Sequence, residues 1–82
     1  MNTKVGEIRH YYEGIGVAVV ELTGELKIGD TIHIRGSHTD FTQAVSSMQV
    51  EHEKIDTANP GDSIGIKVND KVREKDVVYK IT

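Results

Sequence analysis

Cysteine is absent from this chain of 82 residues. A disulfide framework and a thiolate metal site are therefore both excluded. A small domain that folds without disulfides fits a reducing compartment, so we expect a cytoplasmic protein.

Long apolar runs are missing as well. The N-terminus passes from Met1 directly into polar sequence, and no stretch is long enough for a secretory signal or a membrane span. The sequence therefore predicts that no membrane is among the partners.

A basic excess is the third absence. The chain has 13 acidic and 10 basic residues, which gives a formal net charge of −3. Dedicated nucleic-acid-binding proteins usually carry a basic excess, so this balance argues against an extensive nucleic-acid interface.

The length leaves room for one domain, which we place at residues 1–82. A chain this short buries only roughly 60–65% of the surface that its unfolded form exposes. Little core would remain to support a deep active site, so we expect a binding module without enzymatic activity.

Apolar residues recur with the period of two that is typical of strands. In 30–35 and 63–68, isoleucines alternate with polar or small residues, which predicts half-buried strands. The run from Ile15 to Leu22 is apolar at both parities and β-branched, which predicts a central, well-buried strand. No stretch has the i, i+3, i+4 apolar spacing of a helix. About six short strands separated by turns predict an all-β fold. Closure into a small barrel is favoured over a sandwich, because closure removes exposed edges.

Two breaks in parity refine the prediction. Val5 and Ile8 fall on opposite parities, so a bulge near Gly6 would return both to the core. The segment 41–52 changes parity near Ser46-Ser47, which indicates either a bulge or two strands that share a bend. The predicted core then consists of Val20, Leu22, Ile32, Ile34, Met48, Val50, Ile64 and Ile66.

One short pattern occurs twice. The sequence Gly-Asp-(Thr/Ser)-Ile-x-Ile begins at Gly29 and again at Gly61. In each copy, glycine can adopt a positive φ and aspartate can accept a backbone hydrogen bond before a strand begins. Two similar turns within one fold explain the pattern, since the chain is too short for a repeat array.

Nearly the whole chain resembles, in the right order, the second-domain β-barrel of the translational GTPases of the elongation factor Tu superfamily. Segment 16–22 also resembles the free-standing translation elongation factor-like small proteins, and related barrels form the C-terminus of U32 (collagenase-like) peptidases. The resemblance implies a barrel that binds RNA or the ribosome, or alternatively a protein-interaction or accessory domain. It is carried by Val5-Gly6-Glu7-Ile8, Leu26-Lys27-Ile28-Gly29-Asp30, Met48, Ala58-Asn59-Pro60-Gly61-Asp62-Ser63-Ile64-Gly65 and Val72-Arg73-Glu74-Lys75-Asp76-Val77.

The chain departs from this family in two respects. No Gly-x-x-x-x-Gly-Lys-(Ser/Thr) loop is present, so we expect no binding of GTP and no other cofactor. In elongation factor Tu the barrel helps to hold the aminoacylated end of tRNA with an acidic residue before the methionine and an asparagine after Gly-Asp. Ser47 and Ser63 occupy those places here, which argues against that mode of tRNA binding.

Catalytic and metal-binding patterns are weak. Ser37-His38-Thr39-Asp40 contains the residue types of a catalytic triad, but triad members converge from separate segments, so a polar loop is the better interpretation. The four histidines lack the close spacing of a metal site, and no pair of carboxylates is placed in an apolar pocket. The sequence predicts no catalytic residue and no metal ligand.

A basic cluster near the last turn is the remaining candidate site. Arg35, Lys67, Lys71 and Arg73 could contact phosphates, with Tyr11, Tyr12 or Tyr79 available for stacking. The alternative is an ordinary solvated surface, because acidic residues are interleaved at 70, 74 and 76. The sequence leaves two functions open: a translation-factor-like module that binds RNA or the ribosome, and an accessory domain that binds a protein partner.

Overall fold

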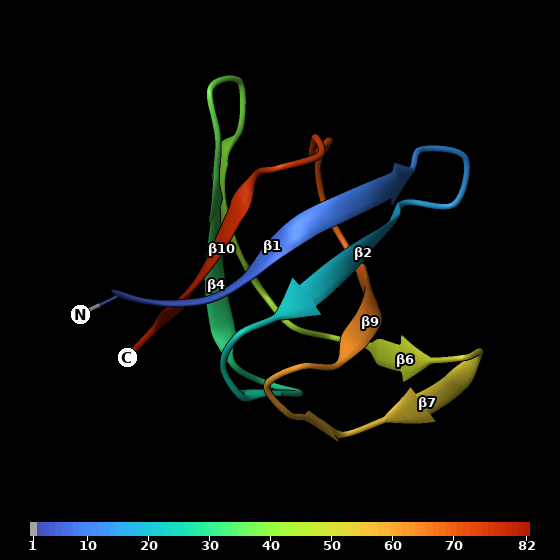
Figure 1. Ribbon diagram of the computed structural model, residues 1–82. Helices are drawn as coiled ribbons and strands as arrows, with labels where there is room; N and C mark the ends of the chain where they lie inside the picture. The colour runs from blue at the N-terminus through green and yellow to red at the C-terminus, as the bar shows by residue number, and fades with distance from the viewer. Residues whose placement is uncertain (1) are drawn as a thin grey trace.

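The computed structural model describes residues 2–82. In that range the chain contains ten strands and no helix, so the all-β prediction is confirmed (Figure 1). It therefore contains no helix that is long and apolar enough to cross a membrane. The strands are β1 (Asn2–Tyr12), β2 (Val17–Leu22), β3 (Leu26–Lys27), β4 (Thr31–Arg35), β5 (Asp40–Ala44), β6 (Met48–Val50), β7 (Glu53–Ile55), β8 (Thr57–Ala58), β9 (Ser63–Lys67) and β10 (Val77–Ile81).

Eight of these strands form one antiparallel sheet in the order β5-β4-β10-β1-β2-β9-β6-β7. The sheet curves around its core, while β3 and β8 pair separately (Figure 1). Among the described residues the backbone ladder does not run from β5 to β7, so the predicted closure into a barrel is not confirmed. The count also exceeds the expected six strands, in part because segment 41–52 divides into β5 and β6 at the bend around Ser46-Ser47.

The inward-facing side chains of the curved sheet form a continuous apolar core. Of the eight predicted core residues, only Val50 is not fully buried, because it ends β6 just before the turn to β7. The core consists of Val5, Ile8, Ala18, Val20, Leu22, Leu26, Ile32, Ile34, Val45, Met48, Ala58, Ile64, Ile66, Val68, Val72 and Val78.

The predicted bulge in β1 is present. The register between β1 and β10 shifts between Lys4 and Gly6, so Val5 and Ile8 both point into the core. A Cβ atom on Gly6 would lie 2.7 Å from Cγ1 of Val20, which only glycine avoids. The bulge thus lets Val5 and Ile8 both face the core, and glycine at position 6 leaves room for Val20.

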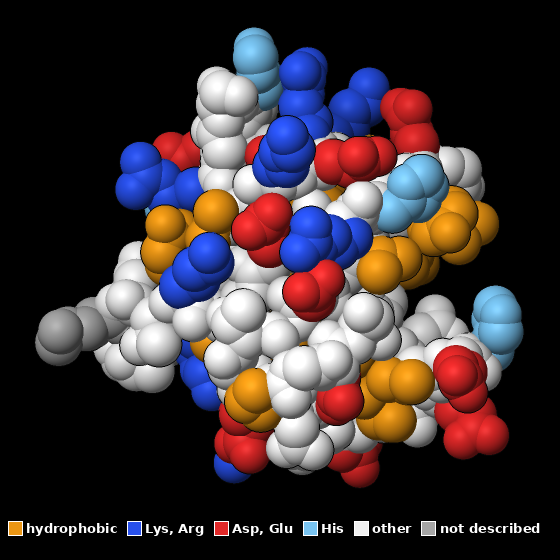
Figure 2. All heavy atoms as spheres, in the orientation of Figure 1, with side chains coloured by type: hydrophobic (Ala, Val, Ile, Leu, Met, Phe, Trp, Pro, Cys, Tyr) orange, Lys and Arg blue, Asp and Glu red, His pale blue; other side chains and the backbone are white. Residues whose placement is uncertain are grey.

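One strand departs from the sequence prediction in a way that matters for function. Ala18, Val20 and Leu22 of β2 are buried, but Val17 and Val19 on the opposite face are only half-buried. Ile15, in the turn before β2, is 63% exposed. Figure 2 shows hydrophobic side chains exposed over the β1–β2 hairpin. The prediction of a strand buried on both faces is wrong, because nothing in residues 2–82 covers its outer face.

The repeated Gly-Asp turn occurs three times in the structure, not twice. At Asp30 and Asp62 the carboxylate accepts a hydrogen bond from the backbone N–H three residues earlier, at 2.9 Å in both turns, and the preceding glycine has φ 93°. Asp76 repeats this geometry with Arg73 at 2.8 Å, and Lys75 takes the glycine position with φ 76°. Each turn leads directly into a strand, β4, β9 or β10, and is closed by bonds between residues three apart.

Candidate binding groove

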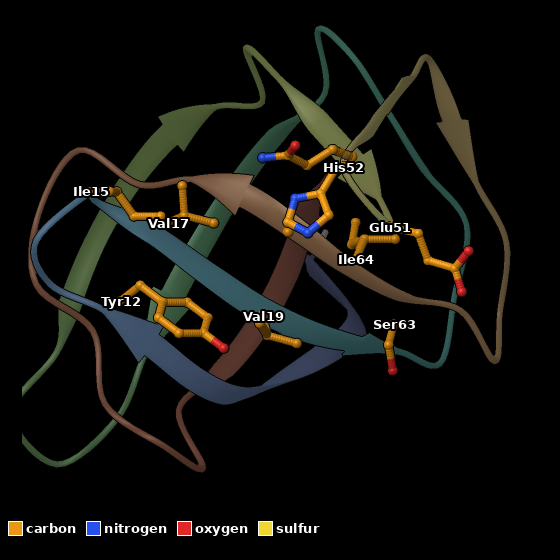
Figure 3. Close-up of a pocket in the computed structure, with 10 residues that line it drawn as sticks. Tyr12, Ile15, Val17, Val19, Glu51, His52, Ser63 and Ile64 are labelled. Carbon is orange, nitrogen blue, oxygen red and sulfur yellow. The ribbon is translucent and has the colours of Figure 1, made fainter.

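A groove of about 460 Å³ lies on the outer face of β2, β9 and β6 (Figure 3). Tyr12 and Ile15 lie at one end, and Glu51 and Ser63 lie at the other. The groove is lined by Tyr12, Ile15, Val17, Val19, Gln49, Glu51, His52, Ser63, Ile64 and Gly65.

Strand alternation places these side chains on one face. Ile64 and Ile66 of β9 point into the core, so Ser63, Gly65 and Lys67 point outward. Across the sheet, Gly65 pairs with Val19 of β2 on one side and with Gln49 of β6 on the other. The groove floor is therefore a regular part of the sheet, with small residues along β9 and larger residues on either side.

Gly65 is the position that makes the surface concave. Its backbone pairing is regular and its φ is not positive, so the chain conformation does not require glycine there. A Cβ atom at this position would lie 3.3 Å from Cγ1 of Val17 and 3.5 Å from Cγ of Gln49. Glycine inside a strand without a bulge is typical of a place that another group approaches closely.

The β6–β7 turn brings two side chains to the same face. Glu51 and His52 form this two-residue turn with φ 50° and 68°. Hairpin turns of this kind favour Asn-Gly, because side chains are strained at positive φ. Glu51 and His52 reach the rim of the groove from this turn (Figure 3). The turn therefore holds a carboxylate and an imidazole at positions where Asn-Gly would be less strained.

The other end of the groove is formed by the β1–β2 hairpin. Tyr12 is 49% exposed, and its ring meets that of His10 edge-on at a centroid distance of 4.4 Å. Nζ of Lys67 donates a hydrogen bond to the backbone oxygen of Ile15 at 3.3 Å. This bond fixes the hairpin next to β9 and leaves an ammonium group at this end.

Charge differs between the two ends. Glu21 pairs with Ser63 across the sheet and accepts a hydrogen bond from Nε of Arg9 at 2.9 Å. This hydrogen bond, together with the negative charge of Glu21, raises the pKa of Arg9 above its ordinary value. Glu51 lies at this end too, and no ion pair among the described residues involves it. The groove thus runs from a cationic end through an apolar middle to an anionic end.

The predicted phosphate-contacting residues divide between two places. Lys67 and Lys71 both contact the β1–β2 hairpin, and Nζ of Lys71 lies 3.4 Å from the carboxylate of Glu13. Arg35 ends β4, and Arg73 begins the turn capped by Asp76. Acidic and basic side chains alternate over the face seen in Figure 2.

The Ser37-His38-Thr39-Asp40 segment forms the end of the β4–β5 hairpin and not a triad. Oδ1 of Asp40 lies 2.5 Å from Nε2 of His33, which is across the hairpin. The hydrogen bond from His33 is the main reason why the pKa of Asp40 is lowered. Within residues 2–82, no group of three or more His, Cys, Asp or Glu side chains is arranged to hold a metal ion.

The groove itself was not among the sites predicted from the sequence. Two signals point to it: the glycine in the middle of a regular strand pattern, and a β-branched run that is apolar at both parities. Both were compatible with a buried strand, because sequence alone does not reveal whether another layer covers the outer face.

No family model matches the chain. Over 77 residues it is 42% identical to an uncharacterized protease of Methanocaldococcus jannaschii. This match covers 93% of this chain and 19% of the protease. It is 39% identical over 80 residues to a collagenase of Porphyromonas gingivalis, with 95% of this chain and 22% of the collagenase covered. Elongation factor 1-alpha of Methanopyrus kandleri is 34% identical over 70 residues, 74% of this chain and 16% of the factor. The chain thus spans about a fifth or less of the length of the curated relatives it matches.

Among solved structures, the fold is that of the C-terminal domain of a Geobacillus thermoleovorans protein described as a U32 peptidase. The TM-score is 0.91 at 22% identity, and the match covers 98% of this chain and 93% of that domain. The expected resemblance to U32 C-terminal barrels is therefore supported, whereas identity as a translation factor is not. The chain has the fold of a U32 peptidase C-terminal domain and is similar in sequence to segments of larger proteases.

Proposed function

We propose that residues 1–82 form a single accessory domain without catalytic activity, which binds a polypeptide partner through the groove. The observation that carries this proposal is the half-exposed apolar outer face of β2 beside Gly65. The similarity to a protease and to a collagenase supports a role next to a peptidase.

The physical character of the groove favours a polypeptide. Its middle is apolar, and its rim offers a carboxylate, an imidazole, an amide and hydroxyl groups. A concave apolar surface with a few polar groups at its edge is typical of a binding site. Exposed apolar side chains cost free energy in water, and a covering segment would recover it.

RNA is the less favoured partner. The net charge of −3 repels a polyanion, and one of the four candidate basic groups, Lys71, is paired with Glu13. The experiment below therefore includes RNA as the competing ligand. Its contacts would be made by Arg35, Lys67, Lys71 and Arg73.

The experiment compares two ligands by fluorescence anisotropy at about 0.15 M salt. Labelled chain is titrated with reduced, carboxymethylated α-lactalbumin, which is permanently unfolded, and with total yeast tRNA. We expect saturable binding of the unfolded protein, and no cleavage of it on a gel. Binding of tRNA alone would overturn the proposal, as would cleavage by the chain itself.

Two variants localise the binding. Gly65→Val fills the groove floor and should abolish binding of the unfolded protein, since an added Cβ already lies 3.3 Å from Val17. Gly14→Val is the matched control, because a Cβ atom on Gly14 would meet no atom within 4 Å. Equal loss of binding in both variants would show that the groove is not the site.

A further inference from the structure

We infer that the groove takes an extended polypeptide segment that carries an aliphatic side chain and, two residues away, a lysine or arginine. This inference rests on the proposed function and adds the chemistry of the occupant.

The shape selects a linear segment. Ser63 and Gly65 have small outward side chains on β9, between Val19 of β2 and Gln49 of β6. The result is a channel that follows β9. At one end Lys67 crosses to the β1–β2 hairpin, where Nζ bonds to the oxygen of Ile15. The channel is therefore closed at the Lys67 end and open at the Ser63 end.

The middle of the channel selects an aliphatic side chain. Gly65 adds no side chain to the groove floor, and Cγ1 of Val17 and Cγ of Gln49 lie beside it, 3.3 and 3.5 Å from the place that a Cβ atom would take. Tyr12 and Ile15, both strongly exposed, extend the apolar surface toward the hairpin. A leucine or valine side chain that lies over this floor would bury its own apolar surface and that of Val17 and Val19.

The open end selects a cation. Glu51, in the β6–β7 turn, and Glu21, on β2, flank Ser63. Among the described residues only Glu21 of these two has a cationic partner, Arg9. A lysine or arginine at this end would give Glu51 the partner that the described residues do not supply. An acidic side chain would be repelled here, so the charge sets the direction of the bound segment.

The distance between the two subsites fixes the spacing. Gly65 and Ser63 are two residues apart on one strand, which corresponds to about 6.6 Å. Side chains at positions i and i+2 of an extended segment have the same separation and point the same way. An aliphatic residue over Gly65 therefore places a basic residue at i+2, or at i−2 in the opposite direction, next to Glu51.

The experiment uses the whole chain, labelled with ¹⁵N, and three capped pentapeptides. The first is Gly-Leu-Ser-Arg-Gly, the second replaces Arg by Glu, and the third replaces Leu by Ser. We expect the first to shift the amide signals of Gly65, Val19 and Glu51 with a Kd of about 0.1–1 mM. The second and third should bind at least about fivefold more weakly.

A charge reversal completes the design. Glu51→Lys should weaken the Arg peptide and strengthen the Glu peptide, while Glu51→Gln should weaken the Arg peptide about two- to fivefold. Glu25→Lys, which makes the same charge change outside the groove lining, is the control. Glu51 is exposed, so these variants should keep the fold, which the same spectra report.

The outcomes separate this inference from the proposed function. If the Arg and Glu peptides bind equally and Glu51→Lys changes nothing, the inference fails while binding of unfolded protein can still stand. If none of the peptides shifts the groove amides, the inference is overturned. Only the loss of unfolded-protein binding as well would overturn the proposed function.

Discussion

The side-chain oxygen of Gln43 accepts a hydrogen bond from the backbone N–H of Asn69 at 2.7 Å. The amide nitrogen of the same side chain donates to the backbone oxygen of Lys67 at 2.8 Å. Gln43 lies on the edge strand β5, and its partners lie at the end of β9 and just after it. A single buried amide thus joins two parts of the sheet that share no backbone ladder.

Replacement of Gln43 by leucine should lower the free energy of unfolding by about 1–3 kcal/mol. Two hydrogen bonds from the buried Gln43 side chain to the backbone would be lost, and each contributes about 0.5–1.5 kcal/mol. Urea unfolding measures the change. Gln49→Leu, at a half-buried glutamine with no such bonds, is the control and should change stability by less than about 1 kcal/mol. Equal effects at the two positions would mean that the Gln43 bonds contribute nothing.

Lys75→Gly should stabilise the protein by about 0.5–1 kcal/mol. Lys75 is held at φ 76° in the third Asp-capped turn, where glycine carries no steric penalty. The converse substitution, Gly61→Ala, imposes the same strain at φ 93° and should destabilise by a similar amount or more. Thermal unfolding of both variants tests this, and a destabilised Lys75→Gly protein would contradict it.

The double substitution Glu51→Asn and His52→Gly should raise stability and weaken binding. Asn-Gly suits a two-residue turn with both φ angles positive, so a gain of about 1 kcal/mol is expected. Removal of the carboxylate and the imidazole from the groove should lower the affinity for the Arg peptide. A variant that gains stability and keeps full affinity would show that neither side chain serves binding.

The β4–β5 hairpin should lose stability in acid. The pKa of Asp40 is below its ordinary value, mainly because of the hydrogen bond from His33. A carboxyl group with a lowered folded-state pKa contributes stability above its unfolded pKa, near about 4, and loses it as pH falls through the folded value. At pH values below about 4, the urea midpoint of the parent should therefore decrease more than that of Asp40→Asn. Parallel pH profiles would contradict the role of this pair.

Any binding of RNA should be weak and sensitive to salt. The net charge is negative, and Lys71 is already paired with Glu13. With three or four phosphate contacts at most, affinity for tRNA should collapse between low and physiological salt. Lys71→Glu combined with Arg73→Glu should abolish what remains at low salt, as measured by anisotropy. Tight binding at about 0.15 M salt would show that this expectation is wrong.

The sequence predicted the strands and the core more fully than the site. Alternation of apolar residues identifies Ile32, Ile34, Ile64 and Ile66 as inward-facing, because a half-buried strand has that period whatever surrounds it. The bulge at Val5 follows from the same rule. Val17 and Val19 were predicted to be buried and are only half-buried, since an outer apolar face is buried or open according to what lies above it.

Two further features depend on contacts between distant segments. The sequence places a turn at 72–77, but its likeness to the two Gly-Asp turns is hidden because lysine occupies the glycine position at Lys75, and only the backbone geometry reveals it. The role of Gln43 was equally hidden, because its partners are 24 and 26 residues away in the chain. Sequence pattern reports local preference, and these features are decided by tertiary structure.

The three Asp-capped turns have a consequence for how fast the chain folds. Each is closed by bonds between residues three apart, so it can form on the microsecond timescale of small local structures. The pairing of β1 with β10 joins Lys4 to Tyr79 and must wait for almost the entire chain to come together. Refolding after dilution from denaturant should therefore take milliseconds to seconds, as in other proteins dominated by non-local strand pairing. Gly61→Ala would slow refolding if its turn is already formed in the transition state, and would mainly speed unfolding if the turn forms later.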